Sequence, residues 1–288
     1  MDHHHEGLAA DLERLLETAT SRRQSLRWLL SGMAALPLAG CGGGGSVGSV
    51  GAGAAGSSTG STSSSGSSGS TSASCAVIPE ETGGPYPGDG TNSNGSGVAN
   101  ALTLAGIVRS DIRTSVAPGS ATAQGIPLTI KLQLVNVSAS CASIAGAAVY
   151  LWHCDRDGNY SMYASGLTKE NYLRGVQEAD ANGIVSFTTI FPGCYAGRMP
   201  HVHFEVFPTL AKAASAAGRI KTSQFTFPMA TLNEVYANSS YATSSRNLAS
   251  ISYATDNVFS DGTSLQMGAV SGNASTGYTV TLVVGVSL

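Results

Sequence analysis

The feature that most constrains this chain is a tract of glycine and serine between residues 42 and 74. Of its 33 residues, 11 are Gly and 13 are Ser. A segment of this composition cannot bury enough apolar surface to offset the entropy lost on ordering, so it acts as a flexible tether. We therefore predict a linker over 41–74 that separates a short N-terminal segment from a globular body over 75–288, a length that suits a single β domain.

The N-terminal segment carries the features of an export signal. A pair of arginines at 22–23, similar to a twin-arginine signal, precedes an apolar stretch over 28–38 that is too short to span a membrane as a helix. The stretch ends in Leu38-Ala39-Gly40-Cys41, which resembles the lipobox of a bacterial lipoprotein. We predict a signal peptide over 1–40, lipidation of Cys41 and a location in the cell envelope or periplasm. An ordinary secretory signal is the alternative.

The charge of the chain limits its partners. It holds 15 Lys and Arg against 18 Asp and Glu, a formal net charge of −3. Binding to nucleic acid needs clustered basic side chains to neutralise phosphates, so the sequence predicts no nucleic-acid partner. No apolar run reaches about 18 residues, so we expect contact with a membrane only through a lipid on Cys41.

The remaining cysteines are Cys75, Cys141, Cys154 and Cys194. An even number in an exported chain favours two disulfides, with free thiols as the alternative. The sequence does not choose among the three pairings.

The body has the pattern of an all-β domain. Apolar residues alternate over 128–135, and short apolar runs follow in the order 147–152, 184–190, 202–207 and 278–286. The dipeptide Asn182-Gly183, typical of a hairpin turn, directly precedes the run 184–190. Only 210–217 looks helical, and 237–275 looks like loops with one or two short strands. We predict a β-sandwich or barrel and favour a single β-sandwich.

Two of the three histidines of the body, His201 and His203, lie two residues apart in a strand pattern. Side chains alternate along a strand, so these imidazoles project from one face with their Cα atoms about 7 Å apart. Such a pair can bind one metal ion. Two surface histidines on a solvated strand are the alternative.

Four runs around these histidines resemble the intradiol ring-cleavage dioxygenases, a family that includes the protocatechuate 3,4-dioxygenase and catechol 1,2-dioxygenase types. In chain order the runs are VYLWHCD…GNY over 149–160, YLRGVQ over 172–177, FTTIFPGCY over 187–195 and GRMPHVHF over 197–204. The opening over 75–86 is similar to that of exported members. The helical dimerisation segment typical of catechol 1,2-dioxygenases is missing from the body, which favours the protocatechuate type of β core and leaves a homo-oligomer open.

The resemblance implies a non-haem Fe(III) centre with four protein ligands. Carried over residue by residue, these ligands are Tyr160, Tyr195, His201 and His203. A phenol has a pKa near 10, so it ionises at neutral pH only beside a strong Lewis acid, and a hard phenolate oxygen in turn favours ferric iron.

The resemblance also implies a reaction, the cleavage of a catechol-type aromatic diol by O2 to a muconate-type diacid. Tyr195 matches a tyrosine that also accepts a proton during turnover. Arg198 matches an arginine that stabilises charge developing on the substrate, and Gln224 matches a glutamine behind the metal. This chemistry belongs to the catabolism of aromatic compounds.

Several nearby residues depart from the family or invite other roles. Cys194 stands where exported members often have tryptophan, and Thr226 stands where some members have a tyrosine. We expect His153 to pack or to lie behind the metal rather than to ligate it. The loops 155–158 and 180–183 fail the calcium-loop pattern and are better interpreted as turns.

Two other functions fit parts of the sequence. One is a non-catalytic β-sandwich lipoprotein that binds an aromatic or carbohydrate ligand, and the other is a zinc or copper domain that uses the two histidines alone. The body has no nucleophile elbow, P-loop or dinucleotide-binding glycine pattern, so hydrolase, phosphoryl-transfer and NAD functions have no support.

Overall fold

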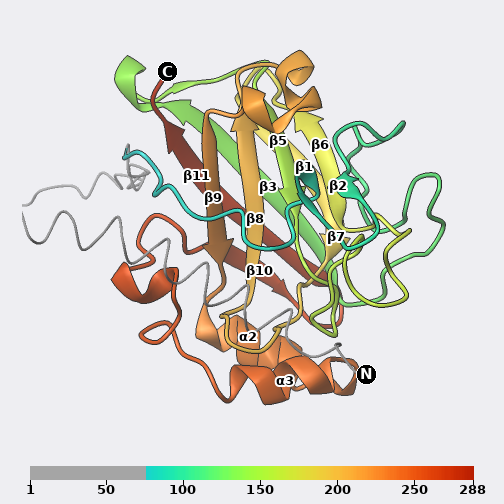
Figure 1. Ribbon diagram of the computed structural model, residues 1–288. Helices are drawn as coiled ribbons and strands as arrows, with labels where there is room; N and C mark the ends of the chain where they lie inside the picture. Colours follow the sequence, from blue (N-terminus) through green and yellow to red (C-terminus); the bar gives the residue numbers. More distant parts are fainter. Residues whose placement is uncertain (1–75) are drawn as a thin grey trace, which may run out of the picture. The chain divides into compact units, whose positions relative to one another are not determined.

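The structure is a computed structural model that describes residues 76–288, drawn as a coloured ribbon in Figure 1. The predicted signal peptide, the lipidation of Cys41, the tether and Cys75 lie outside the described residues.

Strands dominate the described part of the chain. They are β1 (Asp89–Ser93), β2 (Val98–Asn100), β3 (Pro127–Asn136), β4 (Ala142–Ser143), β5 (Ala148–Trp152), β6 (Arg174–Glu178), β7 (Ile184–Ile190), β8 (His201–Phe207), β9 (Lys221–Thr226), β10 (Ala269–Asn273) and β11 (Gly277–Val286). All five strand segments predicted from the sequence are present as β3, β5, β7, β8 and β11.

The strands form two main sheets and one hairpin. One sheet has five strands in the order β10-β11-β3-β4, with β7 also paired to β3, and the other has four strands in the order β6-β5-β8-β9. Strands β1 and β2 form a separate antiparallel pair, and β11 runs parallel to β3. The predicted β-sandwich is therefore confirmed.

The core lies between the two main sheets. In β3 the residues Leu128, Ile130, Leu132 and Leu134 are all fully buried, and they belong to the same cluster as Val202, Phe204 and Val206 of β8. Burial of this apolar surface is the main stabilising contribution to the fold.

Strand β8 is buried on both faces, although its two faces have different surroundings. Its even-numbered residues enter the sandwich core, whereas its odd-numbered residues His201, His203 and Glu205 face away from that core. On this second face the aromatic side chains of Tyr150, Trp152 and Tyr160 form a separate buried cluster. Loops cover this face, so the histidines are buried without lying in the sandwich core.

The Asn182-Gly183 turn has a different role from the one predicted. Asp180 Oδ1 accepts hydrogen bonds from the backbone N–H groups of Asn182 and Ile184, and Gly183 has a φ of 75°. The turn links β6 to β7, which belong to different sheets. It therefore carries the chain from one layer to the other rather than closing a hairpin.

The helical prediction was partly wrong. The segment predicted as helical forms two 3-10 turns, Leu210–Ala214 and Ala216–Gly218. Two α-helices, α2 (Met229–Tyr236) and α3 (Ala242–Leu248), lie side by side at one end of the strands (Figure 1). Further 3-10 turns are Val137–Ala139, Ser239–Tyr241 and Phe259–Asp261.

Part of the segment predicted as loop between 237 and 275 is therefore helical. Helix α3 was missed because its sequence is polar and it buries only Ser244 and Leu248. The one strand in that segment is β10.

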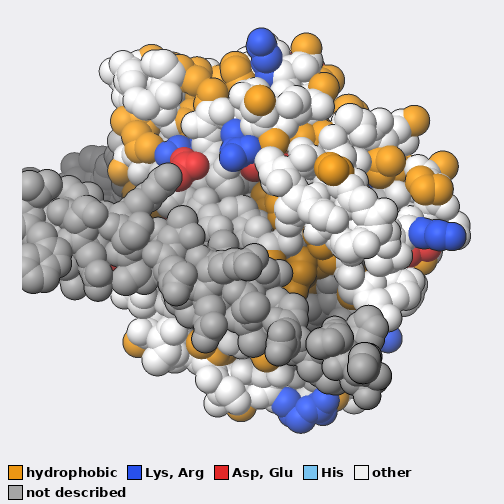
Figure 2. Space-filling model, viewed as in Figure 1, with side chains coloured by type: hydrophobic (Ala, Val, Ile, Leu, Met, Phe, Trp, Pro, Cys, Tyr) orange, Lys and Arg blue, Asp and Glu red, His pale blue; other side chains and the backbone are white. Residues whose placement is uncertain are grey.

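The surface shows no sign of a basic patch on the face in Figure 2, where Lys and Arg side chains are scattered singly among polar and apolar ones. Among residues 76–288, no helix is both long and apolar enough to cross a membrane.

Candidate metal centre

The two histidines of β8 converge. Their Nε2 atoms lie 3.0 Å apart, and each side chain is 2% exposed. Nδ1 of His201 lies 2.6 Å from the carbonyl oxygen of Met199, which can only accept, so Nδ1 carries the proton and Nε2 presents a lone pair. The His201 nitrogen that faces His203 is therefore available as a ligand.

The imidazole of His203 is held by packing. The indole of Trp152, on the neighbouring strand β5, stacks on it with ring centroids 4.9 Å apart and planes 2° apart. Trp152, His203 and Gln224 occupy adjacent positions on β5, β8 and β9. A row across three strands thus fixes this side of the site on rigid elements.

Tyr160 reaches the histidines from the loop after β5. Its ring is buried, and its Oη lies 3.5 Å from Nε2 of His201. The loop turns at Asp155, whose carbonyl accepts from the N–H of Gly158, as predicted for a turn.

Tyr195 reaches the same point from the turn that follows β7. Its ring centroid lies 5.8 Å from that of Tyr160 and 5.5 Å from that of His201. It is more exposed than Tyr160, and a Cβ on Gly158 would come within 3.1 Å of its Cα. The structure therefore brings together all four residues that the sequence analysis named as ligands.

The electrostatics of the cluster suit a metal ion. Burial lowers the pKa of His201 to about 3 and that of His203 well below its usual value, so both imidazoles are neutral at physiological pH. Burial also raises the pKa values of the Tyr160 and Tyr195 phenols, which keeps them protonated without a strong Lewis acid. Two neutral imidazoles and two phenols at one point form a donor set that fits ferric iron.

Among the described residues, no group of three or more His, Cys, Asp and Glu residues gathers to hold a metal. The candidate site depends instead on two histidines together with two tyrosines.

A hydrogen-bonded network lies behind these four residues. Arg198 donates through Nη2 to Oε1 of Gln224 at 2.8 Å and lies 3.5 Å through Nη1 from Oη of Tyr195. Gln224 in turn donates through Nε2 to the carbonyl of Thr82 at 2.7 Å. Arg198 and Gln224 thus lie beside the four candidate ligands.

Asp256 completes this network, and the sequence analysis missed it. Its Oδ2 accepts from Nε of Arg198 at 3.0 Å, and the side chain is fully buried. It lies in the segment predicted as loop, and no spacing pattern connects it to Arg198 58 positions away.

The segment 82–86 covers the histidine face. A Cβ on Gly84 would lie 3.3 Å from Cε1 of His203, and the ring of Tyr86 lies 4.9 Å from that of Tyr160. Arg174 fixes this segment by donating to the carbonyls of Tyr86 and Pro87.

His153 is not a ligand. Its Nδ1 lies 2.8 Å from the carbonyl of Cys154 and its Nε2 lies 2.7 Å from Oγ1 of Thr189. Both ring nitrogens are therefore hydrogen-bonded within the protein, as expected for a residue that packs behind the site.

Thr226, which stands where some family members have a tyrosine, donates a hydrogen bond to the carbonyl of Pro200.

The prediction of two disulfides was wrong. Cys154 and Cys194 are buried free thiols, bonded instead to the carbonyls of Gly193 and Arg198 at 3.4 and 3.3 Å. Only Cys141 among the described cysteines is disulfide-bonded. Burial raises the pKa of Cys194 to about 12, so without a metal ion its thiol stays protonated beside Tyr195.

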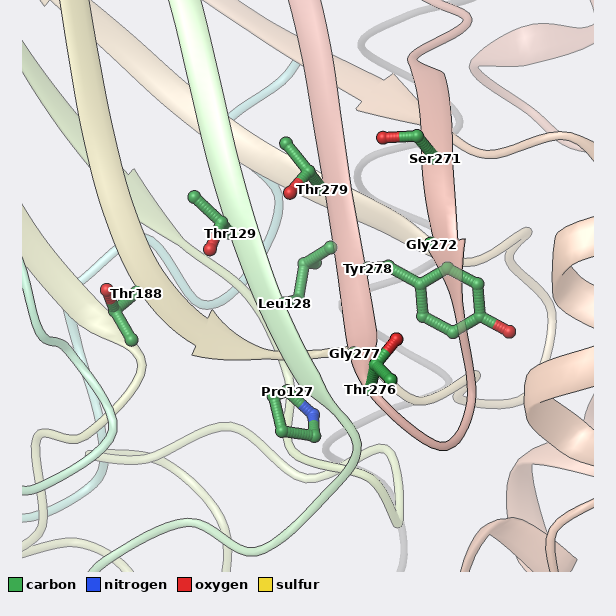
Figure 3. A pocket seen from close by; sticks show the side chains of 10 residues that line it. All are labelled: Pro127, Leu128, Thr129, Thr188, Ser271, Gly272, Thr276, Gly277, Tyr278 and Thr279. Carbon is green, nitrogen blue, oxygen red and sulfur yellow. The ribbon is translucent and has the colours of Figure 1, made fainter.

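A hollow elsewhere on the molecule is unrelated to this chemistry. It has a volume of about 200 Å³ and is lined by residues of β3, β7, β10 and β11, among them Thr129, Thr188 and Thr279 (Figure 3). None of the histidines or tyrosines of the metal centre lines it.

Comparison with known proteins agrees with this site. Residues 109–206 match the model of a family described as dioxygenase, and this segment contains all four candidate ligands and Arg198. The structure is similar to an intradiol ring-cleavage dioxygenase from Tetranychus urticae, with 25% identity, a TM-score of 0.55, and coverage of 74% of this chain and 95% of that one.

Two other solved structures are similar to this one with lower TM-scores. One is the dioxygenase domain of a dioxygenase carbohydrate-binding protein fusion from Streptomyces sp. SirexAA-E, with 22% identity, a TM-score of 0.46, and coverage of 74% of this chain and 99% of that one. The other is a catechol 1,2-dioxygenase from Pseudomonas arvilla C-1, with 19% identity, a TM-score of 0.40, and coverage of 64% and 59%.

The family match and the Tetranychus urticae likeness point to the same class of proteins. Over the matched residues and in its fold, the chain is similar to the intradiol ring-cleavage dioxygenases, a class of oxidoreductases.

Proposed function

We propose that this protein uses non-haem Fe(III) to cleave a catechol-type aromatic diol with O2, between the two hydroxyl-bearing carbons, to a muconate-type diacid. The observation that carries the proposal is the convergence of two imidazoles and two phenols at one buried point. Bound ferric iron would supply the Lewis acidity that ionises the diol and prepares it for reaction with O2.

The residues of the chain have separate tasks in this reaction. His201, His203 and Tyr160 are fully enclosed and serve to hold the metal. Tyr195 is more exposed, so its oxygen, as a phenolate on bound iron, would be placed to accept a proton from an incoming diol. The guanidinium of Arg198, 3.5 Å from that hydroxyl, stabilises negative charge there.

Water is excluded from the ligand side of the site by its cover. Trp152 stacks on His203, and the segment 82–86 closes over the same ring. Burial of this kind strengthens each electrostatic interaction within the site.

Oxygen uptake tests the proposed reaction. Iron-loaded protein should consume O2 with at least one member of a panel of substituted catechols, and the product should exceed the substrate in mass by one O2 molecule. Absence of uptake with every catechol, in protein that contains its full complement of iron, would contradict the proposal.

Colour separates this function from a zinc domain and from a metal-free ligand-binding lipoprotein. A ferric-tyrosinate protein absorbs visible light through charge transfer from phenolate to iron, whereas a zinc protein or a metal-free ligand-binding lipoprotein is colourless. A colourless protein after iron loading would favour one of the alternatives.

We also propose export to the cell envelope, with a lipid on Cys41 as the membrane anchor. The support is the lipobox-like sequence and the apolar stretch before it. Mass spectrometry of the mature N-terminus tests this, because a diacylated Cys41 is expected as the first residue.

A further inference from the structure

Asp256 has an unusual position for a carboxylate. Its side chain is fully buried, and both of its oxygens are occupied. Oδ1 accepts from the backbone N–H groups of Val258 and Phe259 at 2.8 and 3.0 Å, and Oδ2 accepts from the N–H of Met199 at 2.7 Å and from Nε of Arg198 at 3.0 Å. A buried carboxylate is tolerated only with such a complete set of partners.

These contacts fix the direction of Arg198. An arginine side chain has several rotatable bonds and loses rotamer entropy when it is held in one geometry. Here Asp256 holds the Nε edge of the guanidinium, and the ring of Phe259 lies 5.9 Å from its Cζ. The two remaining nitrogens then point to Gln224 and Tyr195.

We propose that Asp256 is a positioning residue of the active site, which holds Arg198 so that its positive charge lies against the hydroxyl of Tyr195. This inference rests on the proposed dioxygenase function. A competing explanation is that Asp256 only caps the turn Phe259–Asp261 and ties it to the start of β8.

The same contacts couple separate parts of the chain. Asp256, Arg198 and Gln224 form a continuous path that ends at the carbonyl of Thr82, in the segment covering His203. A shift of the guanidinium would therefore displace Gln224 and the segment that covers His203. None of the four candidate ligands is hydrogen-bonded to Asp256 directly.

A double-mutant cycle separates the two explanations. Asp256→Asn keeps the size of the side chain and removes its charge, and we expect a roughly 10- to 100-fold loss of kcat with little change in KM. In an Arg198→Ala background the same change should cost nothing further, because the effects of residues that act as a unit do not multiply. Losses that multiply would overturn the proposal, since a structural role does not need Arg198.

Spectroscopy and structure give readouts beyond turnover. Asp256→Asn should retain the iron content and the visible absorption band of the parent protein, whereas collapse of the start of β8 would disturb His201 and change both. A crystal structure of the metal-free Asp256→Asn protein should show the guanidinium displaced from Tyr195. An unmoved guanidinium would overturn the proposal even if the parent protein shows no oxygenase activity, so the two proposals fail separately.

Two further variants complete the design. Asp180→Asn alters another aspartate that accepts backbone N–H groups in a turn, far from the site in the connection between β6 and β7, and should leave kcat unchanged. If Asp256→Asn does not fold, Asp256→Glu replaces it. Its longer side chain should give a kcat between those of the parent and Arg198→Ala, and a kcat outside that interval would overturn the proposal.

Discussion

At the scale of single residues, the candidate metal ligands and the charged groups beside them have different surroundings. Tyr160 and His203 are enclosed and have contacts mainly with other rings. Arg198 donates through its guanidinium to Gln224 and Asp256 and lies beside the hydroxyl of Tyr195. Substitutions of the candidate ligands should therefore change the iron content, whereas substitutions around the guanidinium should change kcat.

Tyr160→Phe should abolish iron retention, because it removes a phenolate oxygen and leaves the packing of the ring in place. Tyr163→Phe is the matched control, since that hydroxyl bonds to Asn92 and Gly88 on the hairpin side rather than to the histidines. Metal analysis after dialysis checks both variants. Equal iron in Tyr160→Phe and the parent would refute Tyr160 as a ligand.

Arg198→Ala should leave the visible absorption band largely intact and reduce kcat by about 100-fold or more, by analogy with the loss of one charge-stabilising donor in other active sites. Steady-state oxygen uptake measures this effect. Full activity in the variant would remove the proposed role of Arg198.

At the scale of elements, the alternation of β8 made the histidine pair predictable. The period of two placed His201 and His203 on one face from the sequence alone, and the structure agrees. Helix α2 was missed although Leu232, Val235 and Tyr236 follow helical spacing and are buried. The contact between Arg198 and Asp256 could not be predicted, because it depends on how a loop folds back over β8 rather than on any local period.

The loop after β5 offers a test at this scale. Gly158→Ala places a Cβ about 3.1 Å from Cα of Tyr195 at a φ of 89°, so it should reduce both stability and iron content. Gly166→Ala is the matched control, with a φ of 78° and open space around its Cβ. Both variants bear a similar backbone cost of about 1 to 2 kcal/mol, and only the first should lose iron.

Urea unfolding and metal analysis of the two glycine variants separate these effects. Equal iron loss in both would show that backbone strain, and not the contact with Tyr195, disturbs the site.

At the scale of the whole molecule, stability should depend on a buried carboxyl group outside the ligand set. Burial and the nearby Asp89 raise the pKa of Glu205 to about 8 from a usual value of 4.5. The folded protein therefore binds a proton that the unfolded chain releases, and the resulting stability is present below about pH 4.5 and is lost as the pH rises towards about 8.

Glu205→Gln should flatten this dependence and stabilise the protein at alkaline pH. Urea unfolding at a series of pH values between roughly 5 and 9 checks it. The same slope in the parent and the variant would show that another group is responsible.

Removal of residues 42–74 should spare catalysis, because the sequence places every candidate site residue in the body. Oxygen uptake by the shortened protein measures this, and a large loss of activity would contradict the interpretation of that tract as a tether.

The histidine face of β8 lies outside the sandwich core, and segments from distant parts of the chain, 82–86 and 256–259, lie beside it. Laboratory evolution of substrate range can therefore begin in 82–86 and should leave 256–259 unchanged, because Asp256 holds Arg198 and both Val258 and Phe259 belong to the core. A library built in 82–86 would explore new aromatic shapes while the four candidate ligands stay constant.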